Sequence, residues 1–314
     1  MDKVAIIRKK IQNAVPEGLI VPRHTAYAHF YEHTPTRQKF PSVTGITGIM
    51  SSPHLKQWAV NEGIRYIERV WDTITPENRE EHFKVAQLAH TDTLREAGDI
   101  GTLTHDSLEA YINEWIDKGN RPDDIKKFIK LDDSRLYATA RSATLFFNDF
   151  YLIPIVSEMK VVSLKHGYGG TLDCLAYVGK VINEGNGGRT GFEKCNHHWG
   201  VSGRLNAECM HCGRKLKLTL TLLDWKSSNS LEHDEYAEQL SAYSQALYEL
   251  TGVRPRDHWI VRLDKYKARY EVVRVTDRVK AFKAFIHTKK KFDWMTDGVS
   301  KLYPVVEKEV ISIV

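Results

Sequence analysis

The sequence has few cysteines and no long uncharged hydrophobic run. Only four of its 314 residues are cysteines, too few for the disulfide framework of a secreted scaffold. No segment approaches the roughly 20 uncharged residues that a membrane-spanning helix needs. Residues 1–8 lack the apolar stretch of a signal peptide and carry an early acid. We therefore expect a cytoplasmic protein without a signal peptide, a transmembrane segment or a membrane partner.

The chain has a small excess of positive charge. Its 45 basic and 40 acidic residues give a formal net charge of +5, which fits a polyanionic partner without demanding one. Hydrophobic residues make up 42% of the chain and are interleaved with the charged ones. This composition predicts a single elaborated catalytic domain around one core.

The residue pattern divides the chain into successive regions. A helix from Asp2 to about Val15, followed by an irregular or extended stretch, forms an N-terminal extension over 1–53. Helical spacing of apolar residues fills 54–150 almost completely. Gly98 is expected to end one helix there, and a further helix is expected from Gly101 onward.

The pattern then changes to alternating strands and helices, which predict a core over 151–292 and a tail over 293–314. The order of these elements indicates an α/β fold with a mixed central sheet flanked by helices. The expected strands are 155–164, 170–178, 216–226, 259–263 and 269–275, and the expected helices are 232–250 and 277–291.

Two expected strands carry acidic residues close to a lysine. Asp173 closes the segment Gly170-Thr171-Leu172-Asp173, and Asp224 and Lys226 stand two residues apart after an apolar run. Side chains alternate along a strand, so Asp224 and Lys226 share one face and Trp225 faces the other way. If the strands pair, the two carboxylates form an oxygen site for Mg²⁺, to which the Trp225 carbonyl can add a ligand. A surface ion pair is the ordinary alternative.

Other residues gain meaning only in combination with these. Glu158 lies in the preceding strand, and Gln239 and Tyr243 are four apart on one helix face. His105 and Glu109 share a face of an upstream helix. Taken singly, each pair is more typical of a half-buried helix face than of a site.

Together these motifs resemble a known family. G-x-x-D, D-x-K and Q-x-x-x-Y, preceded by G-T-x-x-H at Gly101 to His105, are similar to the RecB-type branch of the PD-(D/E)XK nucleases. The resemblance covers roughly residues 40–265 and includes Pro41-Ser42-Val43-Thr44, which is similar to the phage and mitochondrial exonuclease members. It implies a restriction-endonuclease-like core and hydrolysis of phosphodiester bonds with one or two Mg²⁺ or Mn²⁺ ions.

The resemblance also implies roles for individual residues. The metal ligands would be His105, Asp173, Asp224 and the backbone carbonyl of Trp225, and Glu158 would support them. Lys226 would orient the attacking water and stabilise charge on the phosphate. Gln239 and Tyr243 would position the strand being cut, whereas Glu109 receives no role.

An insertion over 181–215 separates the two acidic motifs. It contains Cys195-x-x-His198 and, ten residues later, Cys209-x-x-Cys212, a spacing that suits a tetrahedral Zn²⁺ site. Four protein ligands leave no open position, so this zinc would be structural, and Gly213 would form a tight turn after it. His197 and His211 remain rival ligands. The iron–sulfur members of the family need an early cysteine, which this chain lacks.

The expected function is a metal-dependent DNA nuclease, an exonuclease that acts on single-stranded DNA or DNA ends in recombination, repair or processing. This expectation follows the exonuclease members, whose helices before the sheet cover the active site. The chain would act in a bacterial or phage-infected cell, with a helicase, annealing or single-strand-binding partner. The alternatives are a structure-specific endonuclease and a non-catalytic DNA-binding protein on the same fold.

Overall fold

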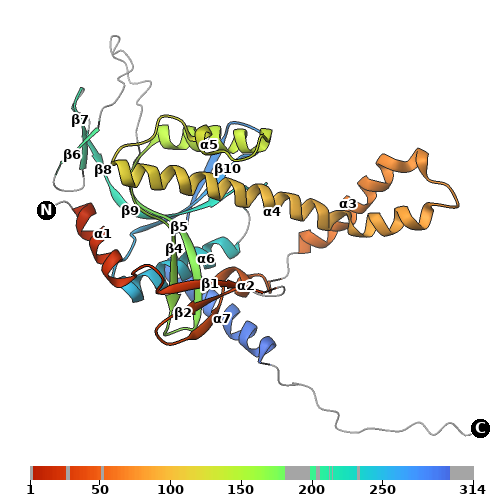
Figure 1. The fold of residues 1–314 in the computed structure, drawn as a ribbon, viewed down its shortest axis with the longest axis horizontal. Helices are drawn as coiled ribbons and strands as arrows, with labels where there is room; N and C mark the ends of the chain where they lie inside the picture. Colours follow the sequence, from red (N-terminus) through yellow and green to blue (C-terminus); the bar gives the residue numbers. More distant parts are fainter. Residues whose placement is uncertain are drawn as a thin grey trace, which may run out of the picture.

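The fold is built around a five-stranded mixed sheet (Figure 1). The computed structural model describes residues 3–25, 29–50, 53–180, 199–202, 206–211, 213, 215–231 and 234–297. The strand order is β11-β10-β9-β5-β4, in which only β9 and β10 run parallel. The strands are β4 (Phe150–Ser163), β5 (Tyr168–Lys180), β9 (Thr219–Lys226), β10 (Asp257–Leu263) and β11 (Tyr270–Arg274). The expectation of a mixed α/β fold with a central mixed sheet is confirmed.

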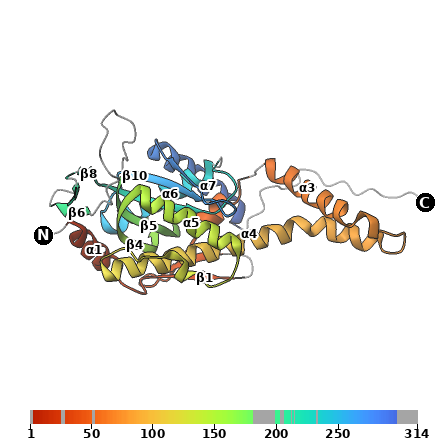
Figure 2. The ribbon, with the colours of Figure 1, turned by 90° about the horizontal axis from the view of Figure 1, so that it is seen from above.

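Helices cover both faces of this sheet (Figure 2). One face packs against α1 (Lys3–Ala14), α6 (Asp234–Thr251) and α7 (Arg278–Thr296), through a core that includes Ile11, Leu240 and Phe285. The other face packs against α5 (Ser134–Asp149) and the C-terminal half of α4 (Arg79–Lys118). Side chains of β9, and of β5 from Cys174 to Val178, alternate between the two cores.

The N-terminal segment contains more regular structure than its sequence indicated. After α1, the strands β1 (Ile20–His24), β2 (His29–His33) and β3 (Gln38–Pro41) form an antiparallel sheet in the order β1-β2-β3. Pro22 lies in the edge strand β1, where a missing backbone donor is tolerated. The short helix α2 (Val43–Thr47) follows and is capped by the side chain of Ser42. These elements pack against β5 beside its residue Gly169.

A helical hairpin projects from the body as an arm (Figure 1). It consists of α3 (Pro53–Val70), the short η1 (Trp71–Thr73) and the N-terminal half of α4. The expectation that Gly98 ends a helix is wrong, because α4 continues through it to Lys118. A glycine inside a helix costs roughly 1 kcal/mol, which the buried residues that follow it on α4 offset. After α4, η2 (Ile125–Phe128) is a short 3-10 helix and leads to α5.

The insertion adds a second small sheet. Its strands β6 (Trp199–Ser202), β7 (Asn206–Cys209) and β8 (Lys215–Lys217) are antiparallel in the order β6-β7-β8. The single strand expected over 216–226 is therefore divided, because β8 pairs with β7 and β9 pairs with β5 and β10.

Within the described part of the chain, no helix is both long and apolar enough to cross a membrane.

Candidate metal centre

The candidate site lies where two neighbouring strands of the central sheet separate. The ladder between β5 and β9 runs from Val178 opposite Thr219 to Cys174 opposite Leu223, and ends there. Asp173 and Asp224 are the next residues on the two strands. The backbone N–H of Trp225 donates a hydrogen bond of 2.7 Å to Asp173 Oδ2. The Asp173 carboxylate thus accepts a hydrogen bond from a backbone N–H that the ladder between β5 and β9 no longer pairs. This bond holds the carboxylate where the two strands begin to separate.

Glu158 faces Asp173 from the adjacent strand in an unusual backbone conformation. Its neighbours Ser157 and Met159 pair with Cys174 and Leu172, so Glu158 stands opposite Asp173. Its φ of 46° is in the left-handed region, which costs a residue with a side chain roughly 1–2 kcal/mol. Such strain persists where surrounding structure enforces it, and it concentrates at functional sites.

His105 of α4 completes a group of three side chains that could hold a metal ion. Its Nδ1 lies 3.5 Å from Glu158 Oε1 and 3.7 Å from Asp173 Oδ2. One ligand atom from each of the three residues lies within 4.8 Å of the others. An imidazole nitrogen and two carboxylates suit a divalent cation such as Mg²⁺ or Mn²⁺. The residues present therefore fit the metal that the sequence indicated, and α4 delivers His105 to it from far upstream.

The charge on His105 shows how these groups interact without a cation. Burial lowers the pKa of His105, but the negative charge of Asp173 and the hydrogen bond that His105 donates to Glu158 outweigh it and raise the pKa to about 9. The imidazolium thus supplies positive charge between the two carboxylates. A divalent cation that binds there must displace this proton.

Asp224 and Lys226 form a buried ion pair beside this group. Lys226 Nζ lies 2.7 Å from Asp224 Oδ2, whose side chain is only 2% exposed. Burial raises the pKa of Asp224 to about 6, against the opposing effect of Lys226. Burial lowers the pKa of Lys226, but Asp224 and Asp173 outweigh it, so the net shift is upward. Lys226 is therefore a charged ammonium group at neutral pH.

The structure brings Gln239 and Tyr243 to the same end of the sheet on α6. Gln239 donates a hydrogen bond of 3.0 Å to Thr47 Oγ1 of α2. Burial, and then the charges of Asp224 and Asp173, raise the pKa of Tyr243 well above its usual value. Its ring packs against Gly170, where an added Cβ would lie 2.3 Å from the ring. The glycine of the G-x-x-D motif is thus explained by the close approach of Tyr243, which the sequence could not show.

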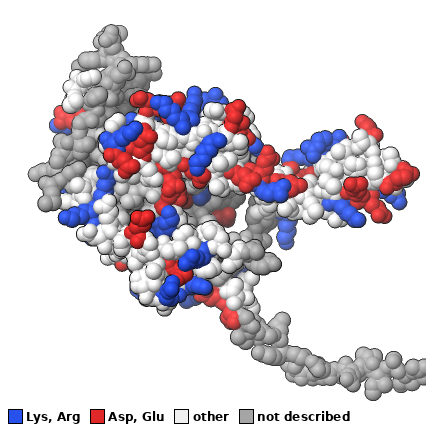
Figure 3. Space-filling model, in the orientation of Figure 1, with Lys and Arg blue, Asp and Glu red and all other residues white. Residues whose placement is uncertain are grey.

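Of the site residues, His105, Glu158 and Lys226 border an open cleft of about 770 Å³. Figure 3 shows this side of the molecule hollowed beside the base of the arm, with acidic atoms inside the hollow. Trp225 borders the cleft, while its indole packs edge-on against Phe146 in the core. The lining residues are His29 and Thr44 from the N-terminal segment, 94–109 in part from α4, Glu158, Trp225 to Ser228, and Lys265. Glu109 is among them but is not part of the three-residue group.

Most of the expected zinc site lies outside the described residues, including Cys195, His197, His198 and Cys212. Cys209 is buried at the end of β7. Gly213 has a φ of +70° and donates a hydrogen bond of 2.8 Å to the Cys209 carbonyl. The tight turn expected there is confirmed, and the zinc itself stays a prediction. Cys174 is fully buried on the far face of β5.

Comparison with known proteins adds no assignment, since no protein-family model and no curated protein matches the chain.

Proposed function

We propose that this protein is a Mg²⁺- or Mn²⁺-dependent DNA nuclease built on a PD-(D/E)XK-type core. The observation that carries the proposal is the group His105, Glu158 and Asp173 beside the Asp224–Lys226 ion pair. The group stands at the end of two diverging strands and borders an open cleft. Acidic side chains at a strand end, with a lysine one step beyond, match the motifs that define this family's site.

The cation would be held by His105, Glu158 and Asp173, with Asp224 and the Trp225 carbonyl as further ligands. When bound, it would lower the pKa of a water molecule and neutralise charge on the phosphate. Lys226 supplies a fixed ammonium group next to the reacting phosphate, where it stabilises negative charge as it develops. Because its pKa is raised, Lys226 acts as a positive charge and a hydrogen-bond donor, and not as a general base.

Two features of the site favour catalysis over a purely structural ion-pair network. Buried charges are costly, and apolar residues of similar size often serve stability as well or better. The left-handed backbone of Glu158 adds a further cost. A non-catalytic DNA-binding protein is the second candidate, because the same cleft could hold a strand without cutting it.

The shape of the cleft supports a strand with a free end as the substrate. The N-terminal segment contributes His29 and Thr44 to one wall, and α4 forms another. Walls on two sides favour a single strand over an intact duplex. The arm of α3 and the first half of α4 projects outward (Figure 1), so the helical region borders the site through α4 only. We propose a structural zinc at Cys195, His198, Cys209 and Cys212.

The test is incubation of the purified protein with end-labelled single-stranded and double-stranded DNA in Mg²⁺, Mn²⁺ or EDTA. Asp224→Asn is the matched variant, since it removes a charge and keeps the shape. Metal-dependent cleavage that is lost in the variant supports the nuclease. Closed circular single strands separate exonuclease from endonuclease action, because an exonuclease leaves them intact. Binding without cleavage under every condition would favour the non-catalytic alternative.

A further inference from the structure

The cleft contains a buried lysine that the motifs do not include. Lys265 lies two residues after the end of β10 and borders the cleft, as do residues of α4. The residue is only 8% exposed, so its stem is enclosed, while its ammonium group stays accessible to solvent. Among the described residues it has no ion pair and no hydrogen bond, and its nearest aromatic contact is the ring of Tyr266 at 5.8 Å.

The carboxylates near Lys265 already form ion pairs with arginines. Asp264 Oδ2 lies 2.9 Å from Arg269 Nη2, and Glu96 Oε1 lies 2.8 Å from Arg135 Nη1. Burial, and then the positive charge of Arg135, lower the pKa of Lys265. An ammonium group in these surroundings gains energy when an anion enters the cleft.

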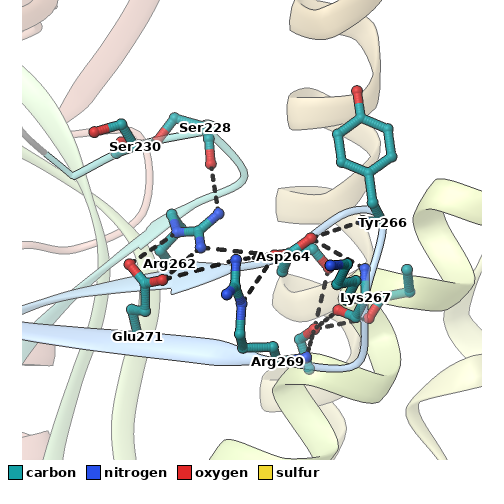
Figure 4. Close-up of polar contacts among 10 residues, drawn as sticks. Ser228, Ser230, Arg262, Asp264, Tyr266, Lys267, Arg269 and Glu271 are labelled. Atoms are coloured by element: carbon teal, nitrogen blue, oxygen red, sulfur yellow. Dashed lines mark hydrogen bonds and ion pairs between the residues drawn. The ribbon is translucent and has the colours of Figure 1, made fainter.

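The turn that carries Lys265 is held by a polar network (Figure 4). Asp264 Oδ1 accepts hydrogen bonds from the backbone N–H groups of Tyr266 and Lys267, at 2.9 and 3.0 Å. Ser142 of α5 accepts a hydrogen bond of 3.0 Å from the backbone N–H of Arg269. The fold thus fixes the backbone around Lys265 before any ligand binds.

The same network holds the loop that follows the catalytic strand β9. Arg262 of β10 pairs with Glu271 of β11, at 2.7 Å between Nη2 and Oε1. It also donates a hydrogen bond of 3.4 Å to the carbonyl of Ser228. Ser228 lies two residues after Lys226, so this bond connects the network around the turn of Lys265 to the segment that carries Lys226.

The part of the cleft that α4 lines contains small residues. On α4, Ala97, Gly98 and Gly101 border the cleft between Leu94 and His105. Nothing lies within 4 Å of the position that a Cβ on Gly98 would occupy. Small residues leave space for a polymer backbone to pass along the helix toward His105.

We infer that Lys265 binds a phosphate of the substrate strand that flanks the phosphate being cleaved. This inference rests on the proposed nuclease function and adds a second contact to it. Lys265 touches substrate in this assignment, and it holds no metal and transfers no proton. The ammonium group of Lys265 has no ion pair among the described residues, and a bound phosphate would supply the opposite charge.

The experiment compares Lys265→Met with Lys267→Met, which removes the same charge from an exposed position of the same turn. The probe is a short fluorescein-labelled oligothymidylate, and binding is measured in EDTA over a range of salt concentrations. Each phosphate contact to a single strand contributes about 0.7 to the slope of log K against log salt. Lys265→Met should lower this slope by about 0.7 and weaken binding roughly 10-fold to 100-fold. Lys267→Met should leave both quantities unchanged.

Three further readouts separate a phosphate contact from a structural role. Lys265→Met should keep or raise the Tm, since the lysine makes no ion pair or hydrogen bond within the described residues that the variant would lose, and it should keep the Mn²⁺ affinity. It should raise KM and leave kcat nearly unchanged. Lys265→Arg should restore the salt slope. In a scan of methylphosphonate substitutions, one position should weaken binding to the wild type but not to Lys265→Met.

Equal salt slopes for the wild type and Lys265→Met would overturn the inference, as would a lowered Tm with unchanged binding. In both cases the wild type still cleaves, so the nuclease proposal stands. A wild type that neither binds nor cleaves DNA would overturn both.

Discussion

Lys226 Nζ lies 2.7 Å from Asp224 Oδ2, and the Asp224 side chain is almost fully enclosed. This contact pairs the Lys226 ammonium group with the carboxylate that lies two residues earlier on the same strand face. The raised pKa of Lys226 follows from it, since Asp224 and Asp173 outweigh the effect of burial. The pair is therefore preformed, and its charge need not be assembled during the reaction.

Lys226→Met should lower the rate of single-turnover cleavage by roughly 100-fold to 1,000-fold, as loss of one electrostatic donor does in other enzymes. DNA binding should stay largely intact, because the rest of the cleft is unchanged. Lys267→Met is the control, since it removes an equal charge from the surface. Full activity in Lys226→Met would mean that the site is wrongly assigned.

A divalent cation should stabilise the folded protein through the three-residue group. At a Mn²⁺ concentration of about 100 times Kd, the gain in unfolding free energy is about 2.7 kcal/mol. Asp173→Asn should remove most of the Mn²⁺-dependent rise in Tm, because Asp173 contacts both His105 and the Trp225 backbone. Glu109→Gln is the matched control, since Glu109 borders the same cleft outside the group. An equal loss in both variants would place the cation elsewhere.

The sequence predicted the residues of the site better than their contacts. Strand alternation placed Asp224 and Lys226 on one face, and the apolar runs around Asp173 and Asp224 made strand pairing the natural expectation. The pairing register of β5 and β9 is a tertiary property, however, and the interruption at Cys174 and Leu223 has no local signal. The left-handed φ of Glu158 also lacks one, since glycine and asparagine are the residues that usually mark that conformation.

Two other features of the structure could not be predicted, for physical reasons. Gly98 resembles a helix end in sequence, but helix propensity is a weak preference that tertiary packing overrides. Lys265 was missed because an isolated lysine after a strand resembles any solvated surface charge. Only its burial and the arginine-paired carboxylates around it distinguish it, and both depend on elements far away in the chain.

His258 should make the protein sensitive to acid. Burial, and then Arg278, lower the pKa of His258 to about 4, and the residue is 1% exposed. Between pH 6.5 and about 4 the unfolded chain takes up a proton that the folded chain does not. The contribution of neutral His258 to the unfolding free energy is therefore present above pH 6.5 and is lost as the pH falls. The loss is about 3 kcal/mol in total.

Denaturant unfolding of the wild type and His258→Gln across this pH window tests the effect. The two proteins share their other titrating groups, so the difference between their unfolding free energies isolates His258. As the pH falls, the unfolding free energy of the wild type should decrease relative to that of His258→Gln. A constant difference would show that His258 titrates alike in both states.

Cys209→Ser should lower zinc content and thermal stability before it affects cleavage. The proposed zinc joins the turn at Cys209 and Gly213 to the earlier pair, Cys195 and His198, and it has no open position for catalysis. Cys174→Ser is the control, because Cys174 is buried in the core of the sheet. Atomic absorption should show one zinc per chain in this control and in the wild type. Unchanged zinc in Cys209→Ser would refute the ligand set.

Gly170→Ala should disturb the site through packing alone. The new Cβ would lie 2.3 Å from the Tyr243 ring, and neither β5 nor α6 can yield freely, since both belong to the core. Overpacking of this kind costs about 1–3 kcal/mol. The displaced ring also adjoins Asp173 and Asp224, so cleavage should fall further than the lost stability explains.

Gly98→Ala is the control, and its effect on stability should have the opposite sign to that of Gly170→Ala. A Cβ at Gly98 meets nothing within 4 Å, and alanine is favoured over glycine in a helix by about 1 kcal/mol. This variant should unfold at a higher denaturant concentration than the wild type, whereas Gly170→Ala unfolds at a lower one. If both substitutions stabilised the protein, the contact between β5 and Tyr243 would not be as close as the structure shows. The role of Gly170 in the G-x-x-D motif would then need another cause.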